Sequence, residues 1–296
     1  MSRKKEKQPK LKTHKIMNRP ILALILMPLF CMLISTIFGG IIDSIGQSYN
    51  PDYIGGAGVA IGALVTLAIY KKWFKGEFEG NLTTRNLGKG LLLVAPAIVF
   101  FIMNLFDLDF STVTAGAVIL AVLEGAGPGI MEEVAFRGLS GSNFMRVWRD
   151  EKKFVLIVTL TSILFGASHL FNIIAGAGGA ISLVQAIYAF GFGVLFCAVY
   201  FRSGTLWPTM IMHTLIDASA FLNPGFTGVL EDSGFDPQMI YLALIGIAFG
   251  ALGYYYIRPA KRAEMIDIWS RKWANALPIH PEETEVNEPE NPAPEE

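Results

Sequence analysis

Charged residues are scarce in this chain. They make up 17% of its 296 residues, whereas hydrophobic residues make up 52%, and the mean hydropathy is +0.46. A soluble domain carries about 25% charged residues, so the composition excludes an ordinary soluble globular protein. A net charge of −1 gives no sign of a nucleic-acid-binding surface either.

Cysteine is nearly absent as well. Cys31 and Cys197 are the only two, and each lies inside an apolar run with no second cysteine or histidine nearby. This spacing excludes a disulfide framework. Both are therefore expected to be buried and to behave as small hydrophobic residues.

The charges that are present gather at the two ends of the chain. The first 19 residues hold eight Lys or Arg, and the last 20 hold seven Glu and five Pro. Between them lie apolar runs long enough to cross a bilayer. The run from Ile21 to Ile42 is too long for a cleaved signal peptide and lacks a clear cleavage site, so we read it as the first spanning helix.

The apolar runs predict an all-α, polytopic membrane protein with about eight transmembrane helices. Helices are expected because each one satisfies its own backbone polar groups in lipid, and the alternation typical of a barrel strand is missing. The predicted spans are 20–42, 53–70, 90–106, 112–136, 154–172, 180–201, 206–222 and 238–257.

Loop charge predicts the orientation of these spans. Every Lys and Arg falls in the two tails or in the loops 71–89, 137–153 and 202–205. The other loops carry only acids: Asp43, Asp52, Asp107, Asp109, Glu231, Asp232 and Asp236. Positive loops stay in the cytoplasm, so both termini are predicted to be cytoplasmic in a multi-pass plasma-membrane protein.

Three regions follow from this pattern. Residues 1–19 form a basic tail that can touch anionic lipid, and 20–258 form one transmembrane domain. Residues 259–296 form a second cytoplasmic tail, which is expected to be disordered from about 277 because it is rich in Pro and Glu. The oligomeric state is left open.

Few ionisable residues lie within the spans, and each is a functional candidate because burying a charge in lipid is costly. They are Glu124, Glu132, Glu133, Arg137, His169, His213 and Asp217. Glu133 and Arg137 share a helix face because they are four residues apart, and His213 and Asp217 repeat that spacing. Glu132 points elsewhere and can face a cavity. If these spans converge, the cluster suits the activation of a water for hydrolysis.

Simpler interpretations stay open for each residue. Glu133 and Arg137 can form a structural ion pair, and each histidine can be an interhelical hydrogen-bond partner. Asp217 can simply orient His213. For Glu124 we favour a structural or boundary role.

Three motifs occur in order on hydrophobic helices: EEVAFR (EExxxR), FGASH (FxxxH) and HTLID (HxxxN/D). With the Gly-rich segment that leads into the last one, they resemble the CAAX-processing and bacteriocin-immunity (CPBP or ABI) family of intramembrane proteases, which includes the type II CAAX prenyl endopeptidases. The resemblance covers residues from about 115 to 222.

The resemblance implies a role for each motif residue. Glu132 would be the general base on the attacking water, assisted by His169, while Glu133 and Arg137 would support the site. His213 and Asp217 would bind the oxyanion, although an ionised Asp217 could only orient His213, because it cannot donate a hydrogen bond. A metal-free mechanism is our expectation. A zinc ion held by Glu132, His169 and His213 is the alternative, although no HExxH helix is present.

Depth poses a difficulty for this site. Counted from the ends of their spans, His169 would lie roughly 10 Å deeper than Glu132 and His213. A longer or tilted span 5 would remove the difference, as would a break in span 4 between Gly125 and Gly129.

The function predicted from these features is an intramembrane endopeptidase that cleaves peptides or membrane-anchored proteins near the cytoplasmic face. A non-catalytic immunity or scaffold protein is the second reading, in which the motifs only stabilise the bundle. A proton-coupled transporter is the third, and it would require inverted repeats, of which we see no sign.

Overall fold

The computed structural model describes residues 16, 19–50, 55–106, 108–148, 151–174, 176–223 and 238–273. Almost all of them are helical, and the only β pairing within these ranges is a single bridge between Phe78 and Trp273. The prediction of an all-α fold is therefore confirmed for this part of the chain. The predicted disorder beyond residue 277 concerns residues outside these ranges.

Eleven α-helices are described, joined in places by other helical turns. They are α1 (Pro20–Gly46), α2 (Gly56–Trp73), α3 (Leu87–Val94), α4 (Ile98–Asn104), α5 (Ala115–Glu132), α6 (Ser142–Val147), α7 (Phe154–Ser168), α8 (Gly179–Ser203), α9 (Trp207–Leu222), α11 (Gln238–Tyr256) and α12 (Arg262–Lys272). A π-helix, η3 (Glu133–Gly141), joins α5 to α6. Short 3₁₀ turns are η2 (Ala95–Ala97), η4 (Glu151–Lys153), η5 (His169–Ile173) and η6 (Pro259–Lys261).

Each of the eight predicted spans coincides with helix. Six helical stretches in the described ranges are long and apolar enough to cross a membrane, so the protein is a multi-pass membrane protein. Two of the predicted spans, which became α2 and α9, are not among the six. The count of eight spans and the side on which the termini lie stay predictions.

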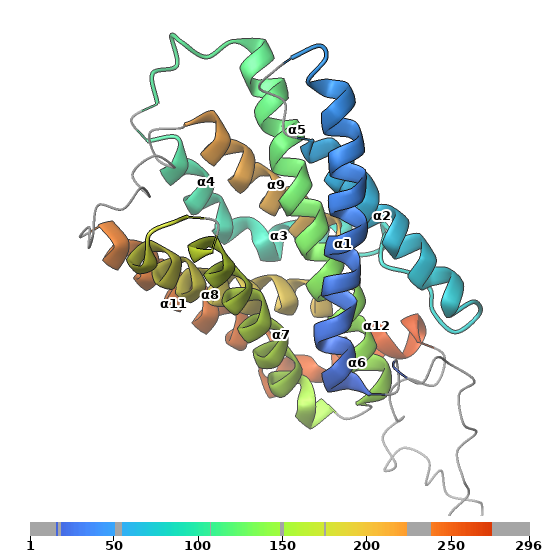
Figure 1. The fold of residues 1–296 in the computed structure, drawn as a ribbon. Helices are drawn as coiled ribbons and strands as arrows, with labels where there is room; N and C mark the ends of the chain where they lie inside the picture. Colours follow the sequence, from blue (N-terminus) through green and yellow to red (C-terminus); the bar gives the residue numbers. More distant parts are fainter. Residues whose placement is uncertain are drawn as a thin grey trace, which may run out of the picture.

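Two groups of neighbouring helices build the bundle (Figure 1). In one, α5 packs against both α2 and α9, and α2 packs against α1. In the other, α8 packs against both α7 and α11. The helices that carry the three sequence motifs, α5 with η3, α7 and α9, thus come from both groups.

The fourth span extends further than the sequence predicted. Instead of ending at 136, it continues through η3 and α6 as one helical stretch from Ala115 to Val147, 33 residues long. It does not break between Gly125 and Gly129, where α5 is continuous. Arg137 and Arg146, which the sequence placed in a loop, belong to this helical stretch, and their side chains are buried in the protein.

This extension removes the depth difficulty. From Glu132 the helix descends to Val147, and α7 then climbs back from Phe154 to His169. Both legs span the same number of residues, roughly 20 Å at the rise of an α-helix. Counted along the chain, Glu132 and His169 are therefore equally far from the turn between α6 and α7, so the count no longer places His169 deeper.

The glycines of α5 serve close packing instead of a break. A Cβ at Gly125 would lie 2.5 Å from the backbone N of Ala218, and one at Gly129 would lie 2.6 Å from that of Thr214. No side chain fits at such distances, so the two positions let the backbones of α5 and α9 touch. This contact brings the end of α5 next to the middle of α9.

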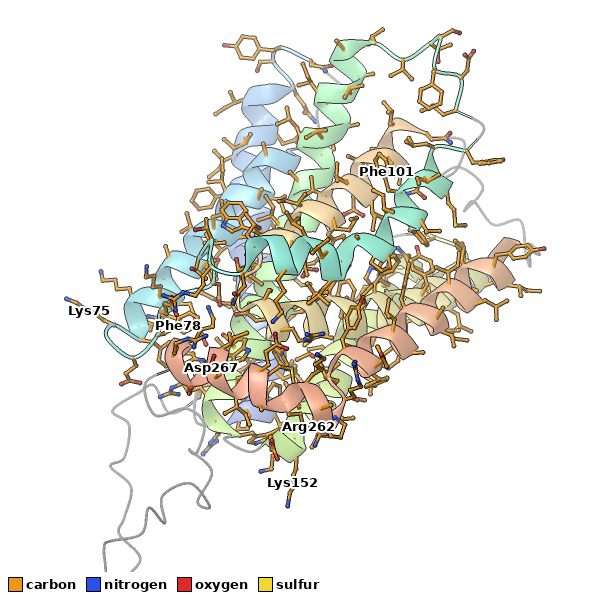
Figure 2. All side chains as sticks on the ribbon, turned by 180° about the vertical axis from the view of Figure 1, so that it is seen from behind. Lys75, Phe78, Phe101, Lys152, Arg262 and Asp267 are labelled. Atoms are coloured by element: carbon orange, nitrogen blue, oxygen red, sulfur yellow. The ribbon has the colours of Figure 1, made fainter. Side chains whose placement is uncertain are left out.

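Charged side chains gather at one end of the molecule, where Lys75, Lys152, Arg262 and Asp267 lie together in Figure 2. The connection from α4 to α5 lies at the opposite end in Figure 1. The basic segments thus share one end of the bundle, which we call the basic end. Its assignment to the cytoplasm stays a prediction.

Helix α12 packs across the basic end, which the sequence did not indicate. The indole N–H of Trp269 donates to the carbonyl oxygen of Phe201 at 3.0 Å, and that of Trp273 donates to Ser142 at the same distance. The side chain of Lys272 donates to the carbonyl of Gly80. The first part of the predicted tail is therefore attached to the membrane domain.

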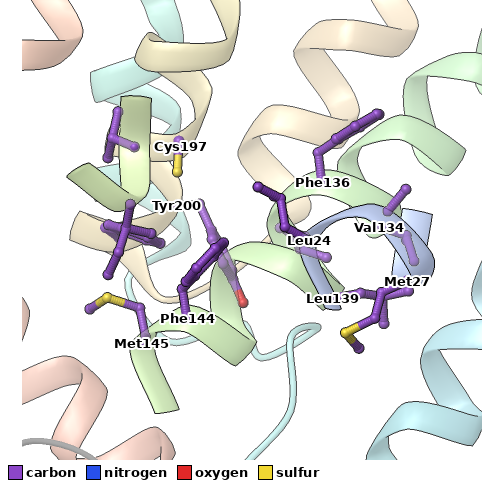
Figure 3. Close-up of a cluster of buried hydrophobic side chains, with 14 of the residues drawn as sticks. Leu24, Met27, Val134, Phe136, Leu139, Phe144, Met145, Cys197 and Tyr200 are labelled. Atoms are coloured by element: carbon purple, nitrogen blue, oxygen red, sulfur yellow. The ribbon is translucent and has the colours of Figure 1, made fainter. Parts of the chain in front are cut away.

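The main apolar core surrounds η3 and α6. Val134, Phe136, Leu139, Phe144 and Met145 are all buried there with side chains from α1, α7 and α8 (Figure 3). Cys31 and Cys197 are buried and free, as expected. Because every residue of η3 is buried, its charged residues must find their partners within the protein.

Candidate active site

The EEVAFR motif lies at the junction between α5 and the π-helix η3. Glu132 is the last residue of α5, and Glu133 to Gly141 follow the wider π turn. Such turns are rare and are frequent at functional sites. The junction separates two neighbouring carboxylates: Glu133 is fully buried, whereas the side chain of Glu132 is 17% exposed.

Glu133 and Arg137 form a sealed ion pair. Arg137 Nη1 lies 2.9 Å from Glu133 Oε1, and the exposed fractions of the two side chains are 1% and 0%. The guanidinium also packs over two aromatic rings. Its Cζ lies 4.3 Å from the ring centre of Phe165 and 5.7 Å from that of Phe196. Cation–π contacts of this kind gain strength when they are desolvated.

His213 lies between the carboxylates. Its Nδ1 is 3.1 Å from Glu133 Oε1, and because a carboxylate only accepts, this nitrogen donates. Its Nε2 faces Glu132 Oε2 at 3.5 Å and Asp217 Oδ2 at 3.6 Å. The imidazole is thus held on one side by the sealed pair and turned on the other toward the two partly exposed acids.

His169 follows the last residue of α7, begins η5, and contacts the cluster through an aromatic ring. Its Nδ1 donates to the carbonyl oxygen of Phe165 at 3.0 Å, which leaves Nε2 with a free lone pair. The ring of Phe165 meets His169 with centroids 5.0 Å apart and His213 with centroids 6.1 Å apart. In the described residues His169 makes no hydrogen bond or ion pair with the acids.

The structure therefore brings Glu132, Glu133, Arg137, His213 and Asp217 into direct contact and places His169 beside them across Phe165. Glu124 stays outside the cluster, because its Oε2 accepts the N–H of Gly56 at 3.2 Å, at the first turn of α2. This contact agrees with the structural role expected for Glu124.

Several atoms of the cluster lack a hydrogen-bond partner in the described part of the chain. They are Glu133 Oε2, Asp217 Oδ2 and the terminal nitrogens of Arg137. Buried polar atoms rarely lack a hydrogen-bond partner, because burying one without a partner costs free energy. Arg137 Nη1 is nevertheless in the ion pair with Glu133 Oε1. Of the three residues, only Asp217 has a partly exposed side chain, so it is the one that can reach water or a substrate.

The three donors named for zinc do not form a metal site as they are placed. No group of three or more His, Cys, Asp or Glu side chains in the described ranges is arranged to hold a metal ion. No step derived below uses a metal, and the choice between the metal-free mechanism and zinc stays a prediction.

Asn81 supports the site and was missed from the sequence. It lies in the loop between α2 and α3, is buried, and donates from Nδ2 to the carbonyl oxygen of Gly138 at 2.8 Å. Its own side-chain oxygen accepts the hydroxyl of Tyr200, and its carbonyl accepts the N–H of Leu206 at 3.0 Å. Asn81 thus joins η3 to α8 and to the start of α9. A lone Asn in a polar loop carries no sequence signal for this role.

Tyr188 on α8 was also missed. It lies near enough to Asp217 and Glu132, the two partly exposed acids, to sense their charge, and its hydroxyl is hydrogen-bonded to Gln185. The ring packs against Phe100 with centroids 5.4 Å apart, so the side chain is held in place. A tyrosine hydroxyl can donate a hydrogen bond, which an ionised Asp217 cannot.

The fold and the cluster define a class, namely a helical membrane protein with a glutamate–histidine site between its helices. Comparison with protein families narrows this class. Residues 114–219 match the family model described as type II CAAX prenyl endopeptidase Rce1-like. The segment contains all six predicted site residues, and it runs from the cap of α5 to the last turns of α9.

This match confirms the resemblance predicted from the three motifs, and it supports an intramembrane protease of the CAAX type in general. The matched segment is less than half of the chain, and α1 to α4, α11 and α12 lie outside it. Comparison with curated proteins gives no match.

Proposed function

We propose that the protein is an intramembrane endopeptidase that hydrolyses a peptide bond with a water activated by Glu132 and His169. One observation carries the proposal: His213 Nδ1 is held by the sealed Glu133, while its Nε2 faces the partly exposed Glu132 and Asp217. A fixed donor next to an accessible base is the arrangement that hydrolysis of an amide requires.

The reaction starts with a water between Glu132 and the substrate carbonyl. Glu132 takes one proton from this water while the oxygen of the water forms a bond to the carbonyl carbon. The carbonyl oxygen becomes an oxyanion and accepts a hydrogen bond from Nε2–H of His213. When the C–N bond breaks, the proton held by Glu132 passes to the leaving amine, which yields a carboxylic acid and an amine. His169, whose Nε2 carries a free lone pair, assists the first proton transfer.

The sealed pair has a supporting role in this proposal. Glu133 orients His213 and favours its protonated form, and Arg137 balances the charge of Glu133. Asp217 orients His213 from the other side.

His213 lies six residues after Trp207, the first residue of α9, which corresponds to roughly 9 Å along the helix. This first residue of α9 follows the basic segment at Arg202. We therefore propose that the substrate segment enters from the basic end, which the loop charges assign to the cytoplasm. Peptides and membrane-anchored proteins are the substrate class. The description of the matched family adds prenylated proteins as a specific case to be tested.

The test uses the full chain in liposomes with a library of membrane-anchored peptide reporters, each prepared with and without a C-terminal prenyl group. Wild type should cleave, and Glu132→Gln should not. Glu124→Gln is the matched control, because it alters a buried carboxylate of the same helix outside the cluster and keeps an oxygen for Gly56. A chelator should leave cleavage unchanged.

Other outcomes would replace the proposal. Equal cleavage by Glu132→Gln and wild type would remove Glu132 as the base. No cleavage by any variant, with a cellular phenotype that survives Glu132→Gln, would favour the scaffold. Proton-coupled uptake by the liposomes would favour the transporter. Loss of cleavage with a chelator, restored by zinc, would overturn the metal-free mechanism.

A further inference from the structure

A second cavity lies away from the cluster, between α1, α2 and η3. Its volume is about 190 Å³, and its walls include Met27 of α1, Trp73 of α2 and Leu139 of η3. Met27 and Leu139 lie side by side in Figure 3. An apolar cavity of about 150 Å³ is enough to bind a benzene molecule, so this one can hold a stretch of hydrocarbon chain.

The polar groups in the walls of this cavity are already satisfied. The hydroxyl of Thr66 donates to the carbonyl oxygen of Gly62 at 2.9 Å, and the hydroxyl of Tyr70 is 3.0 Å from that of Ser142. The remaining walls are apolar side chains. Among the described residues, the walls of this cavity are therefore mainly suited to hydrocarbon.

One wall of the cavity carries a partly exposed tryptophan. Trp73 ends α2, is 40% exposed, and stacks on Phe30 with ring centroids 6.1 Å apart. Tryptophan is enriched at the boundary between lipid and water. Leu26, another wall residue, is 39% exposed on the same side, so a chain can enter from the bilayer.

Two cations belong to the helices that line this cavity. Arg19 is the N-cap of α1 and lies seven residues before Leu26, so it is on the same helix face two turns below it. Lys72 lies in the last turn of α2 next to Trp73. Neither cation forms an ion pair with an acid in the described part of the chain, and both are exposed.

We propose that this cavity binds one acyl chain of an anionic phospholipid, whose phosphate contacts Arg19 and Lys72. The observations that favour a phospholipid are the apolar walls, the partly exposed Trp73 in one wall, and the two exposed cations on the helices that line the cavity. A zwitterionic lipid of equal chains would fill the cavity but would gain less from the two cations. Because Leu139 belongs to η3, the bound chain would touch the helix that carries Glu133 and Arg137.

The test is lipid retention by the purified full chain in native mass spectrometry. The probes are phosphatidylglycerol and phosphatidylcholine with identical acyl chains. Wild type should retain one phosphatidylglycerol in preference to phosphatidylcholine. Arg19→Ala should lower the phosphatidylglycerol-bound fraction about fivefold, which corresponds to one cation near an anionic lipid surface. Leu26→Trp should fill the cavity and lower the retention of both lipids.

Two matched controls separate this site from general effects. Ile25→Trp adds the same ring one residue away, at a side chain that is 45% exposed and does not line the cavity. Lys75→Ala removes one cation from the same end of the molecule (Figure 2). Both should retain phosphatidylglycerol as wild type does, and a thermal melt of each variant checks that it is folded.

Equal retention of the two lipids by wild type would overturn the proposal, and so would equal losses in Leu26→Trp and Ile25→Trp. Retention does not depend on cleavage. A failure here would therefore leave the proposed protease function standing, and a failure of the protease would leave the lipid site standing.

Discussion

Two groups of charges in this protein have opposite environments. Within the membrane domain, Glu133 and Arg137 are 0% and 1% exposed and are surrounded by aromatic rings. At the basic end, Glu264 of α12 bonds to Lys89 and Arg202. The side chains of Glu264 and Lys89 are 38% and 29% exposed, while that of Arg202 is 10% exposed. Exposed pairs contribute about 0–1 kcal/mol, whereas breaking a buried pair costs about 3–5 kcal/mol.

The difference indicates what each group is for. The group at the basic end joins α12 to α3 and α8, and we expect its removal to lower the free energy of unfolding only slightly. A buried ion pair is weak evidence for stability, since apolar residues of similar volume often serve as well. Glu133 and Arg137 are therefore better explained by what they hold, which is His213 next to Glu132.

Arg137→Met should have the largest effect on stability. It leaves Glu133 charged and buried without its cation, and we expect a loss of about 3–5 kcal/mol. The measurement is denaturant unfolding in detergent. The double variant Glu133→Gln/Arg137→Met should recover most of the stability but no cleavage. If the double variant cleaves as wild type does, the sealed pair has only a structural role.

Glu132→Gln should have the largest effect on activity. Removing a general base costs about 10²- to 10⁴-fold in rate, whereas the side chain is partly exposed, so folding should be little affected. Single-turnover cleavage of a reporter measures the rate, and a thermal melt measures the fold. A variant that unfolds as readily as Arg137→Met would contradict the separation of roles drawn between the two carboxylates.

Gly129→Ala should separate the two helices of the site. A Cβ there meets the backbone of Thr214 at 2.6 Å, so α9 must move away from α5 and carry His213 from Glu132. Overpacking costs about 1–3 kcal/mol, and cleavage should fall by more than stability predicts. Gly40→Ala on α1 is the control, because nothing lies within 4 Å of its Cβ. Equal activity of the two variants would show that the close approach is not needed.

Glu264→Gln should have the smallest effect, about 1 kcal/mol or less near pH 7. Burial raises the pKa of Glu264, but hydrogen bonds from Lys89 and Arg202 and their charges outweigh it and hold that pKa below its ordinary value of 4.5. The folded state then binds fewer protons than the unfolded state, so the contribution is present above pH 4.5 and is lost as the pH falls through the lowered pKa.

Unfolding of wild type and Glu264→Gln over this pH range, at low and high salt, measures the contribution of Glu264. The difference between the two proteins should vanish in acid and shrink in high salt. If Glu264→Gln lowered the free energy of unfolding as much as Arg137→Met does, the two groups of charges would not differ in their contribution to stability.

Much of the fold was accessible to sequence reasoning, because hydropathy reports burial in lipid directly. Each of the eight apolar runs coincides with helix, although only six helical stretches in the described ranges are long and apolar enough to cross a membrane. The spacing of four residues correctly paired Glu133 with Arg137 and His213 with Asp217. Where the prediction ended a span at 136, it erred because Arg137 and Arg146 lower the hydropathy of a segment that is in fact buried.

Contacts between distant segments left no such signal. Asn81 reaches Gly138 across 57 positions of the chain, and Trp269 reaches Phe201 across 68. Glycines at 125 and 129 look alike whether a helix breaks there or packs closely. The choice depends on α9, whose backbone occupies the space that a side chain would need.

The sequence by itself determined that this is a helical membrane protein and which few polar residues its helices carry, since both follow from the energy of placing each side chain in lipid. Only the tertiary structure decided how those residues meet. It sealed Glu133 with Arg137, left Glu132 accessible, and set His213 between them, because the positions of these groups depend on a π turn and on backbone contacts between segments far apart in the chain.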